Sequence, residues 1–598
     1  MTLTRLDSPV PRRRFLVYDL EWIPGSDTRP GHVPMELRLI GVYDGNRYRS
    51  YTAIERFLDC ELTPRNAGAW IMAHYGGLSD IQYVLDYLIE RSDYTIEASF
   101  SGSSAIIVSV SKGRYTWTFI DSGWLIRSSL RKIGEWVGEA KGGGNECVEC
   151  GHESKVNPCP ECGHVKEKTD IFYAPLPLLR EYNERDCRIL YRALTLFESI
   201  VVELGGSLER TVASTALALF RRRFLTRDIE TSDSVNDIAR EAYIASRVEN
   251  LSRRCGPTRY YDINSSFPRS MLEKQPGKLR RFHPRLVESE ECYLASLTIS
   301  VPDDLAIPPL PWRAERSGRV FFPTGTWQAW LDSADVRLLL EAGGKIEKVH
   351  NVAYFEPFDD LAAYAETLYG MRLASNDVAF KVVAKYLLNS LYGKFAERSD
   401  KISLMVRPAR IDRKTWTMLR PGVWLAPVDR AIPHCHVPIS CHITALSRAA
   451  LTRLMWQAGT VHYVDTDSLT TPAILPTGSG LGELKLEYPS ALESPDGIAG
   501  AVFAAPKLYR LDKANGEHIV RAKGFSGLDR EGFDKLLAGE SVSTTRMIRV
   551  RENLRSGNTA PTEKTYSKRL LGLTRPKRCH DDKGRTSRPW NVRELEGD

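Results

Sequence analysis

Two aspartates that lie far apart in the sequence, Asp262 and Asp465, occur in segments suited to phosphoryl transfer. Asp262 closes a short apolar run in YYDINSSFPRSM, and Asp465 and Asp467 lie two residues apart in VHYVDTDSL. Transfer to a hydroxyl uses two divalent metals about 3.5–4 Å apart, because the attacking and leaving oxygens both develop negative charge. Side chains two apart on a strand share a face, so Asp465 and Asp467 are expected to point the same way. The segments predict one two-metal site that joins Asp262 and Asp465.

The segment between them, KVVAKYLLNSLYGKF, predicts a helix with one polar face. Lys381, Lys385, Asn389 and Tyr392 recur at spacings of three or four, and Gly393 is expected to end the helix. Such a face suits a nucleoside triphosphate, with ammonium groups at the phosphates and the ring under the base or sugar. An ordinary amphipathic helix has the same periodicity, so the order of the three segments is what favours nucleotide binding.

These segments resemble the motifs of the family B DNA polymerases, which look like DxxSxYP, KxxxNSxYG and YxDTDS in this order. The chain has DINSSFP, KYLLNSLYG and YVDTDS, and the resemblance extends over most of residues 240–530 through LGELKLE and Lys507-Leu508-Tyr509. It implies a DNA-directed DNA polymerase that acts on primer–template DNA and deoxynucleoside triphosphates. Two Mg²⁺ or Mn²⁺ ions are expected at each active site, held here by Asp262 and Asp465.

The resemblance also implies roles for the residues around this site. Lys385 would bind the triphosphate, and Phe267 stands where the family usually has a tyrosine that excludes ribonucleotides. A phenylalanine ring still excludes a 2′-hydroxyl by volume, but it lacks the phenolic hydrogen bond. The residues expected to bind DNA are Tyr243, Lys507, Tyr509 and Lys523.

A second set of carboxylates lies in the first part of the chain. FLVYDLEW places Asp19 and Glu21 on one face of a strand, as metal-dependent hydrolysis of a phosphodiester requires. With HYGGLSD, FIDSGW and YNERDCRIL, this segment resembles the 3′–5′ proofreading exonuclease that precedes family B polymerase domains. The metal ligands implied are Asp19, Glu21, Asp80 and Asp186, with Tyr182 orienting water, Lys168 at the scissile phosphate and Ser122 at the DNA.

The middle exonuclease segment departs from the family pattern. The family favours asparagine after the histidine and phenylalanine before the aspartate, where this chain has Tyr75 and Ser79. By the resemblance, these two positions bind the frayed end of the primer, so the departure is expected to alter that binding. The alternative is a degenerate domain retained for DNA binding, but all four metal carboxylates are present.

Four cysteines form a compact cluster in CVECGHESKVNPCPECGH. The spacing of Cys147, Cys150, Cys159 and Cys162 predicts one tetrahedral, structural Zn²⁺. Redox-active pairs are the alternative, but the two copies are too close together for separate redox sites. The zinc-knuckle insertion would span residues 141–167. Contact with single-stranded DNA, contact with a partner and stapling of a long loop all stay open as its role.

Local patterns indicate the elements that position these residues. Alternating apolar and polar residues predict a strand at 15–21, and residues 105–120 predict a hairpin around Lys112-Gly113. The apolar periodicity predicts helices at 174–224 and 360–396, and the Pro-rich stretch 301–324 is expected to be a loop.

The expected fold class is α/β and α+β multidomain. An RNase H-like exonuclease domain would occupy residues 1–205, and palm and fingers 206–520, with insertions near 275–355 and 397–430. The thumb and a basic C-terminal tail would occupy 521–598.

Length and composition are consistent with such an enzyme. The chain has 598 residues, 42% apolar and 26% charged, so several domains are expected. The net charge of +7 says little, but Lys and Arg concentrate after Arg546 in a pattern suited to a phosphate backbone. The sequence has no long apolar run, no secretion signal and no disulfide framework. We expect a monomer of the bacterial or host cytosol with no membrane partner.

The element AYIASRVEN and the long segments between the motifs resemble the protein-primed branch of phages and linear plasmids. This resemblance implies a terminal protein as primer and strand-displacing synthesis. The family usually has two glycines where this chain has Ala245-Ser246. By the resemblance, this element coordinates synthesis with editing, so the replacement is expected to affect that coordination. One alternative is a primer-independent polymerase with the same motifs. Another is a non-catalytic DNA-binding replication scaffold, against which the intact Asp262, Asp465 and Lys385 argue.

Overall fold

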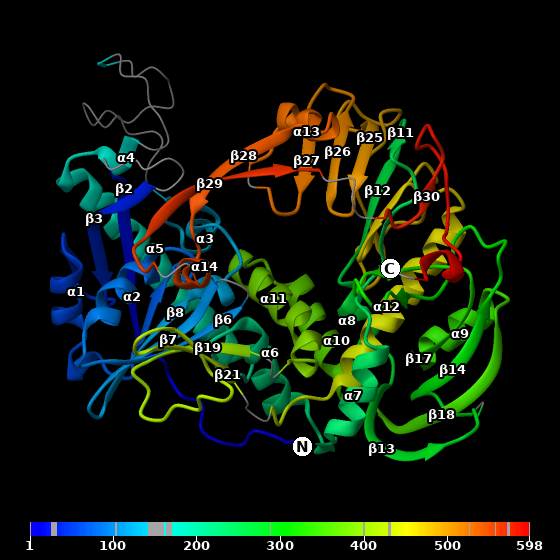
Figure 1. The fold of residues 1–598 in the computed structure, drawn as a ribbon, viewed down its shortest axis with the longest axis horizontal. Coiled ribbons are helices and arrows are strands. Elements are labelled where there is room, and N and C mark those ends of the chain that lie inside the picture. The colour runs from blue at the N-terminus through cyan, green and yellow to red at the C-terminus, as the bar shows by residue number, and fades with distance from the viewer. Residues whose placement is uncertain are drawn as a thin grey trace.

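The structure is a computed structural model that describes residues 2–25, 33–101, 104–141, 161–162, 170–287, 289–398, 401–428, 432–525, 527–555, 558–570 and 575–596. A large sheet with its helices lies at one side, a row of helices in the middle, and smaller sheets at the other side (Figure 1). None of the described helices combines the length and hydropathy needed to cross a bilayer.

The large sheet, here called the N-terminal sheet, has 12 strands. Their order is β20 (Thr417–Arg420), β21 (Val423–Val428), β19 (Lys401–Val406), β6 (Thr95–Ser101), β7 (Ser104–Lys112), β8 (Tyr115–Asp121), β5 (Trp70–Ala73), β2 (Phe15–Pro24), β3 (Val33–Tyr43), β29 (Thr562–Arg569) and β28 (Ser541–Met547), with β4 (Tyr48–Tyr51) also on β3. Strand β2 and the β7–β8 hairpin confirm the predicted elements, and Lys112 pairs with Tyr115 across the hairpin turn.

Helices cover both faces of strand β2, which explains its nearly continuous apolar sequence. Phe15 and Val17 pack toward the long helix α5 (Leu176–Glu203). Leu16 and Tyr18 pack on the other face toward α1 (Ile54–Glu61) and α2 (Asp80–Glu90). The polar Asp19 and Glu21 lie in the middle of this strand and are therefore fixed beside a packed core.

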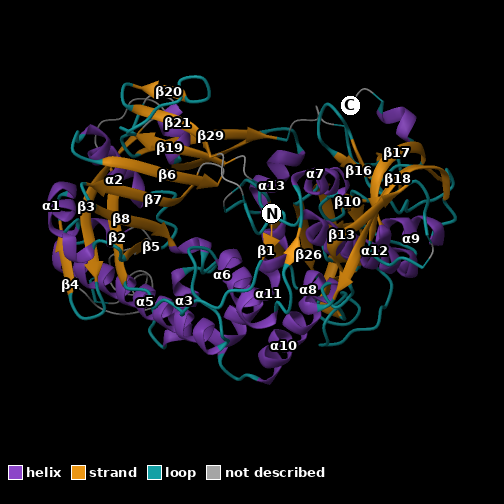
Figure 2. Cartoon of the chain, turned by 90° about the horizontal axis from the view of Figure 1, so that it is seen from below, coloured by secondary structure: helices purple, strands orange, loops and turns teal. Residues whose placement is uncertain are grey.

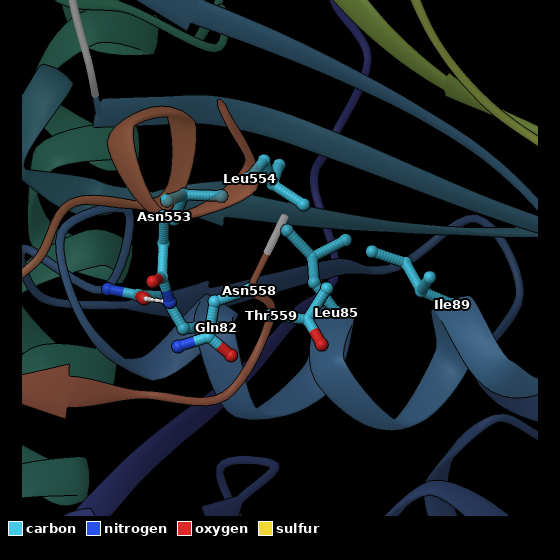
Figure 3. Close-up of a pocket in the computed structure, with 8 residues that line it drawn as sticks. Gln82, Leu85, Ile89, Asn553, Leu554, Asn558 and Thr559 are labelled. Atoms are coloured by element: carbon cyan, nitrogen blue, oxygen red, sulfur yellow. Dashed lines mark hydrogen bonds between the residues drawn. The ribbon is translucent and has the colours of Figure 1, made fainter. Parts of the chain in front are cut away.

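Distant parts of the chain extend both edges of the N-terminal sheet. Strand β19 pairs with β6, so residues of the expected 397–430 insertion continue the sheet. At the other edge, β29 pairs with β3 through Thr562 and Glu563. Beside it, helix α14 (Val550–Arg555) packs on α2, where Gln82 Nε2 donates to the Ile548 carbonyl at 2.7 Å and Asn553 Nδ2 donates to Gln82 Oε1 at 3.4 Å (Figure 3).

A second sheet carries the aspartate motifs. Its order is β10 (Val248–Asn250), β22 (Tyr463–Asp465), β23 (Ser468–Thr471), β12 (Arg259–Ile263) and β24 (Leu484–Tyr488), here called the five-stranded sheet. Leu451 and Met455 of α12 (Val437–Ala458) pack against its apolar side chains. On the opposite face, the rings of Tyr260 and Tyr463 pack against the ring of Tyr509.

The predicted helical regions are confirmed, with breaks. Residues 174–224 form α5, α6 (Val212–Leu219) and a π-helical turn (Phe220–Phe224), and residues 360–396 form α10 (Asp360–Ala374) and α11 (Val378–Phe395). Figure 2 shows α5, α3 (Leu130–Val137), α6, α11 and α10 in a row that starts against the N-terminal sheet and runs toward the sheets of the other side. The expectation that Gly393 ends α11 is wrong, because the helix continues to Phe395.

Helix α4 (Asp170–Tyr173) lies beside the N-terminal sheet, against β2 and α5 (Figure 1). The other elements are α7 (Asp233–Ala242), α8 (Ser266–Ser270), α9 (Ser333–Glu341) and α13 (Arg530–Leu537), a sheet of β13 (Gln275–His283), β18 (Lys345–Phe358), β14 (Tyr293–Val301) and β17 (Gly325–Asp332), a sheet of β11 (Arg254–Cys255), β25 (Ile498–Ala505), β26 (Leu508–Lys513) and β27 (His518–Ala522), and the pairs β1 (Thr2–Leu3) with β9 (Ile229–Glu230), β15 (Trp312–Arg313) with β16 (Val320–Phe321), and β30 (Cys579–His580) with β31 (Ser587–Arg588). The predicted Pro-rich loop contains only the short β15–β16 pair.

Candidate active sites

Asp262 and Asp465, the aspartate site, lie on the same face of the five-stranded sheet. Asp262 pairs with Ser468 across β12 and β23, and Asp465 pairs with the same Ser468 across β22 and β23. Residues directly opposite each other in antiparallel strands point to one face, and neighbouring strands lie about 4.7–4.9 Å apart. The two carboxylates therefore flank one strand and can reach toward a shared space above it.

The expectation that Asp465 and Asp467 share one strand is wrong. Strand β22 ends at Asp465 and β23 begins at Ser468, so the two intervening residues form a tight turn. Thr466 has a φ of 68°, which is rare for a β-branched residue. Its hydroxyl donates to Asp465 Oδ1 at 3.0 Å, while the Asp467 carbonyl accepts from Ile263 N at 2.7 Å. The turn thus joins the segments that carry Asp465 and Asp262.

The electrostatics of the aspartate site show that its carboxylates repel one another. Burial and the charges of Asp262 and Asp465 raise the pKa of Asp467 to about 7. Burial and Glu487 raise the pKa of Asp262 to about 6. Lys385 opposes the rise at Asp262, so the ammonium group of the exposed Lys385 acts on this site. A divalent cation would relieve the same repulsion.

The helix α11 carries the predicted nucleotide-binding face. Lys381, Asn389 and Tyr392 are half-buried, and Lys385 is exposed. The Tyr392 ring stacks on Phe267 with centroids 4.1 Å apart and planes 27° apart. Phe267 lies in α8, directly after the Asp262 strand. The ring pair therefore connects the helix to the aspartate site.

Four of the predicted DNA-binding residues lie in or directly beside α7, β26 and β27. Lys507, with a φ of 61°, forms an ion pair with Asp465 Oδ1, and its carbonyl accepts from the Lys523 backbone at 2.9 Å. Tyr509 is buried against Tyr463, with ring centroids 5.3 Å apart. Tyr243 follows α7, and it adds to the effect of burial in raising the pKa of Tyr392.

The N-terminal carboxylate cluster contains the predicted Asp19, Glu21, Asp80 and Asp186. Burial raises the pKa of Asp19 well above its usual range, and the charges of the other three carboxylates add to this effect. Burial also raises the pKa of Glu21 to about 8. Asp80 Oδ1 accepts from Leu20 N at 3.1 Å, which joins the start of α2 to β2.

Two residues of this cluster were not predicted. Asn183 is fully buried, and its Nδ2 donates to Asp19 Oδ2 at 3.1 Å and to Glu21 Oε1 at 3.2 Å. Lys141 Nζ donates to Asp186 Oδ2 at 2.6 Å and lies 5.2 Å from the centre of the Tyr182 ring. Asn183 follows the predicted Tyr182 directly and could have been found from that helical motif. Nothing local indicates Lys141.

The segment that holds Tyr75 has an unusual backbone. Tyr75 has a φ of 56° and is 40% exposed, and its ring lies 4.5 Å from the ring of the preceding His74. His74 Nδ1 lies 3.0 Å from the Ser122 hydroxyl, and burial lowers the histidine pKa to about 4. Ser122 is fully buried, so it supports this segment and is covered in the protein without DNA.

The cysteine cluster is almost entirely outside the described residues. Cys147, Cys150 and Cys159 are not described, and the same holds for Lys168. Cys162 is described and exposed. In the described part of the chain, no three His, Cys, Asp or Glu side chains are arranged to hold one metal ion.

The two candidate active sites nevertheless have donors that suit a hard cation. Mg²⁺ is commonly held by only one or two carboxylates together with substrate phosphates. The aspartate site supplies such a pair. In the N-terminal cluster, Asp186 Oδ1 is buried and accepts no hydrogen bond from the described residues. The oxygen-rich, mutually repelling side chains of both sites therefore fit divalent cations.

The chain is similar to known polymerases. The family model described as DNA polymerase type B, organellar and viral, matches residues 166–411. A probable DNA polymerase of Ascobolus immersus is 27% identical over 383 residues, covering 58% of this chain and 31% of that protein. The DNA-directed DNA polymerase of Enterobacteria phage PRD1 is 22% identical over 398 residues, covering 59% and 63%. The chain thus spans less than two thirds of the length of these relatives.

The fold is that of a solved polymerase. The structure of the Phi29 DNA polymerase complexed with primer-template DNA and incoming nucleotide substrates matches 94% of this chain and 100% of that chain, with a TM-score of 0.71 and 16% identity. Its complex with single-stranded DNA matches 93% of this chain with a TM-score of 0.67. The two chains therefore share a fold over 94% of this chain at low sequence identity.

Proposed function

Because the chain resembles the type B DNA polymerases of organelles and viruses and has the fold of the Phi29 polymerase, we propose that it is a DNA-directed DNA polymerase. The observation that carries this proposal is the placement of Asp262 and Asp465 on one sheet face around Ser468. These segments are far apart in the sequence, and the same face is reached by the charge of Lys385. Asp262, Asp465 and Asp467 repel one another on this sheet, and folding alone gains nothing from bringing these carboxylates together.

The aspartate site would perform nucleotidyl transfer with primer–template DNA and deoxynucleoside triphosphates. Asp262 and Asp465 would hold two divalent cations, which lower the barrier by stabilising the charge on the attacking and leaving oxygens. Lys385 would bind the triphosphate as a mobile point charge. The stacked Phe267 and Tyr392 would form the floor under the sugar and exclude a 2′-hydroxyl by volume.

Primer extension with Mg²⁺ tests this proposal. Asp465→Asn should reduce extension by on the order of a thousandfold or more, because a neutral amide is a poor ligand for a hard cation. Asp237→Asn is a matched control on the exposed face of α7 and should extend normally. Extension by Asp465→Asn at the rate of the unchanged chain would refute the proposal.

The N-terminal carboxylate cluster supports a second activity, 3′–5′ exonuclease proofreading. Asp19, Glu21, Asp80 and Asp186 would hold the cations, and Asn183 would orient two of these carboxylates. Tyr182 would orient the attacking water. Lys141, at 2.6 Å from Asp186, is a candidate for the role expected of Lys168.

Hydrolysis of a single-stranded oligonucleotide tests the editing proposal. Asp19→Asn should abolish hydrolysis and leave primer extension intact, whereas Asp465→Asn should do the opposite. Loss of both activities in a folded Asp19→Asn protein would contradict the assignment of two separate sites.

Protein-primed, strand-displacing replication with a terminal protein as partner is the priming mode that the resemblance favours. The β13–β18 region and the β19–β21 region occupy the two insertion intervals. Extension of primed and unprimed circular single-stranded DNA, scored for product and length, separates this mode from primer-independent synthesis. Product on the unprimed template without any added protein would favour primer independence.

A structural Zn²⁺ on Cys147, Cys150, Cys159 and Cys162 stays part of the proposal on the basis of the cysteine spacing. The same holds for a monomer in the bacterial or host cytosol. Zinc analysis of the purified chain tests the metal, light scattering tests the monomer, and fractionation of cells that express the chain tests its location.

A further inference from the structure

The last described segment, residues 575–596, folds back onto the side that carries the aspartate site. It lies beside α12 and the β14–β17 region, drawn in red in Figure 1. Its Arg585 carbonyl accepts from the Ser252 hydroxyl at 2.8 Å, and its Gly584 carbonyl accepts from Arg253 N at 2.6 Å. Leu595 is fully buried against Phe321. We call residues 575–596 the C-terminal strap.

The strap inserts one buried cation, Arg578, into the fold. Arg578 is 1% exposed, and it donates to the Ala306 carbonyl at 2.7 Å and to the Ser587 hydroxyl at 2.9 Å. Its Nη1 lies 4.0 Å from Glu249 Oε1. This distance is too long for a hydrogen bond, so Arg578 acts on Glu249 through its charge, while its own hydrogen bonds hold it on the Ala306 carbonyl and the Ser587 hydroxyl.

Glu249 connects Arg578 to a second buried cation. Arg247 Nε donates to Glu249 Oε2 at 2.6 Å, and Arg247 Nη1 donates to the Pro308 carbonyl at 2.9 Å. The Arg247 guanidinium also lies over the Phe322 ring at 4.1 Å. Both arginines therefore bind neighbouring carbonyls of the same Pro-rich loop, and Glu249 lies between them.

The backbone of these residues touches the aspartate site directly. The Arg247 carbonyl accepts from Thr466 N at 2.9 Å, in the turn that follows Asp465. Strand β10 pairs with β22, with Val248 opposite Asp465 and Glu249 opposite Val464. A shift of the strand that carries Arg247 and Glu249 would therefore move Asp465.

We infer that the C-terminal strap positions the aspartate site and that Arg578 is its positioning residue. The strap acts through Glu249 and Arg247 on the strand that holds Asp465, and it touches no reacting atom. The inference rests on the proposed polymerase function for its kinetic consequence. It predicts that the strap is needed for nucleotide incorporation and is dispensable for hydrolysis at the distant N-terminal carboxylate cluster.

Arg578→Met tests the inference, because methionine keeps much of the side-chain volume but neither charge nor donors. We expect kcat for single-nucleotide incorporation to fall by on the order of tenfold or more, because small misplacements of a reacting group have large kinetic effects. The KM for the nucleotide and the rate of oligonucleotide hydrolysis should stay within about twofold. Lys583→Met is the matched control, since Lys583 is an exposed cation of the same strap.

A double-variant cycle and hydrogen exchange distinguish positioning from general stabilisation. If Arg578 acts through Glu249, the effect of Arg578→Met on kcat should largely disappear in a Glu249→Gln background. Amide exchange in peptides covering 247–252 and 463–470 should accelerate in Arg578→Met, while peptides of β2 and α5 stay protected. Equal losses of incorporation and hydrolysis would overturn the inference, and so would an unchanged kcat in a variant whose exchange has accelerated.

The exchange readout is independent of the proposed activity. If the unchanged chain incorporates no nucleotide, the proposed function fails. In that case acceleration at 463–470 still supports the contact between strap and aspartate site. Unchanged exchange at 463–470 in Arg578→Met refutes the inference whether or not the chain is a polymerase.

Discussion

Replacing Glu21 with glutamine is expected to stabilise the metal-free N-terminal part of the chain while it removes a candidate metal ligand. Glu21 is 5% exposed, and burial raises its pKa from 4.5 to about 8, although the hydrogen bond from Asn183 opposes the rise. Glutamine keeps an oxygen that can accept from Asn183 Nδ2. It has no proton to lose, so it removes the cost of burying a charge and little else.

The sign and size of the effect follow from linkage. Because the folded pKa of Glu21 is raised, its stabilising contribution is fully present below pH 4.5 and is lost as the pH rises toward 8. At pH 7 the glutamate therefore costs about 3 kcal/mol relative to the neutral side chain, at ~1.36 kcal/mol for each pH unit above 4.5. At pH 5 the same difference is below about 1 kcal/mol.

The assay is urea denaturation with EDTA at pH 5, 7 and 8, followed by hydrogen exchange of peptides from β2 and α5. A chain with several domains does not unfold in one transition, so the readout has to be local. Glu135→Gln, on the exposed side of α3, is the matched control and should change nothing. A Glu21→Gln protein no more stable than the unchanged chain at pH 8 would refute this reasoning. A gain of the same size at pH 5 and pH 8 would show that packing rather than charge is responsible.

Three further predictions concern the other sites. Phe267→Ala should raise ribonucleotide incorporation relative to deoxynucleotide incorporation by ~10-fold or more, since it removes the ring stacked on Tyr392, whereas Phe267→Tyr should not. The ratio of kcat/KM for ribonucleotides to kcat/KM for deoxynucleotides measures this preference. An unchanged ratio in Phe267→Ala would show that the ring does not exclude ribonucleotides. The Mg²⁺ concentration for half-maximal primer extension should rise as the pH falls from 8 to 6. The reason is that the pKa of Asp262 is raised to about 6 and that of Asp467 to about 7, so protons compete with the cation. A Mg²⁺ concentration that does not change with pH would contradict these raised pKa values. Purified protein should contain one zinc per chain, and Cys147→Ser should lose it; protein that is folded and free of zinc would rule out the structural-metal hypothesis.

Patterns within short stretches of sequence correctly predicted several helices and strands. The strand with Asp19 and Glu21, the hairpin around Lys112-Gly113 and the α11 face with Lys385 all form as expected. In each case the spacing of apolar and polar side chains and the turn residues that indicate the element lie within a short stretch of sequence. The gathering of the four N-terminal carboxylates could be predicted only from the resemblance, because those segments are far apart.

The sequence misled where a backbone conformation had no local signal. The run from Tyr463 to Thr471 looks like one strand because it is rich in β-branched residues, but Thr466 adopts a left-handed conformation and turns the chain. A turn of this kind usually shows glycine or asparagine. The interactions made by Thr466 with Asp465 and with the Arg247 carbonyl stabilise the turn instead. They come from folding and cannot be read from VDTDS.

Residues brought in from a distance could not be predicted either. Lys141 reaches Asp186 from a segment that precedes the undescribed cysteine region. Arg578 reaches Glu249 across more than half the chain. Nothing in the residues around Lys141 or Arg578 distinguishes them from the many solvated cations of this sequence.

The pairing of β19 with β6 and of β29 with β3 has a consequence for biosynthesis. Both partner strands are encoded hundreds of residues after the strands they cover. At ~5–20 residues per second, β3 would wait roughly half a minute or more for β29 to leave the ribosome. During that time unpaired backbone groups at the sheet edges can recruit another nascent chain. The protein is therefore expected to depend on chaperones during translation, and to aggregate when synthesis stops before the final strands are made.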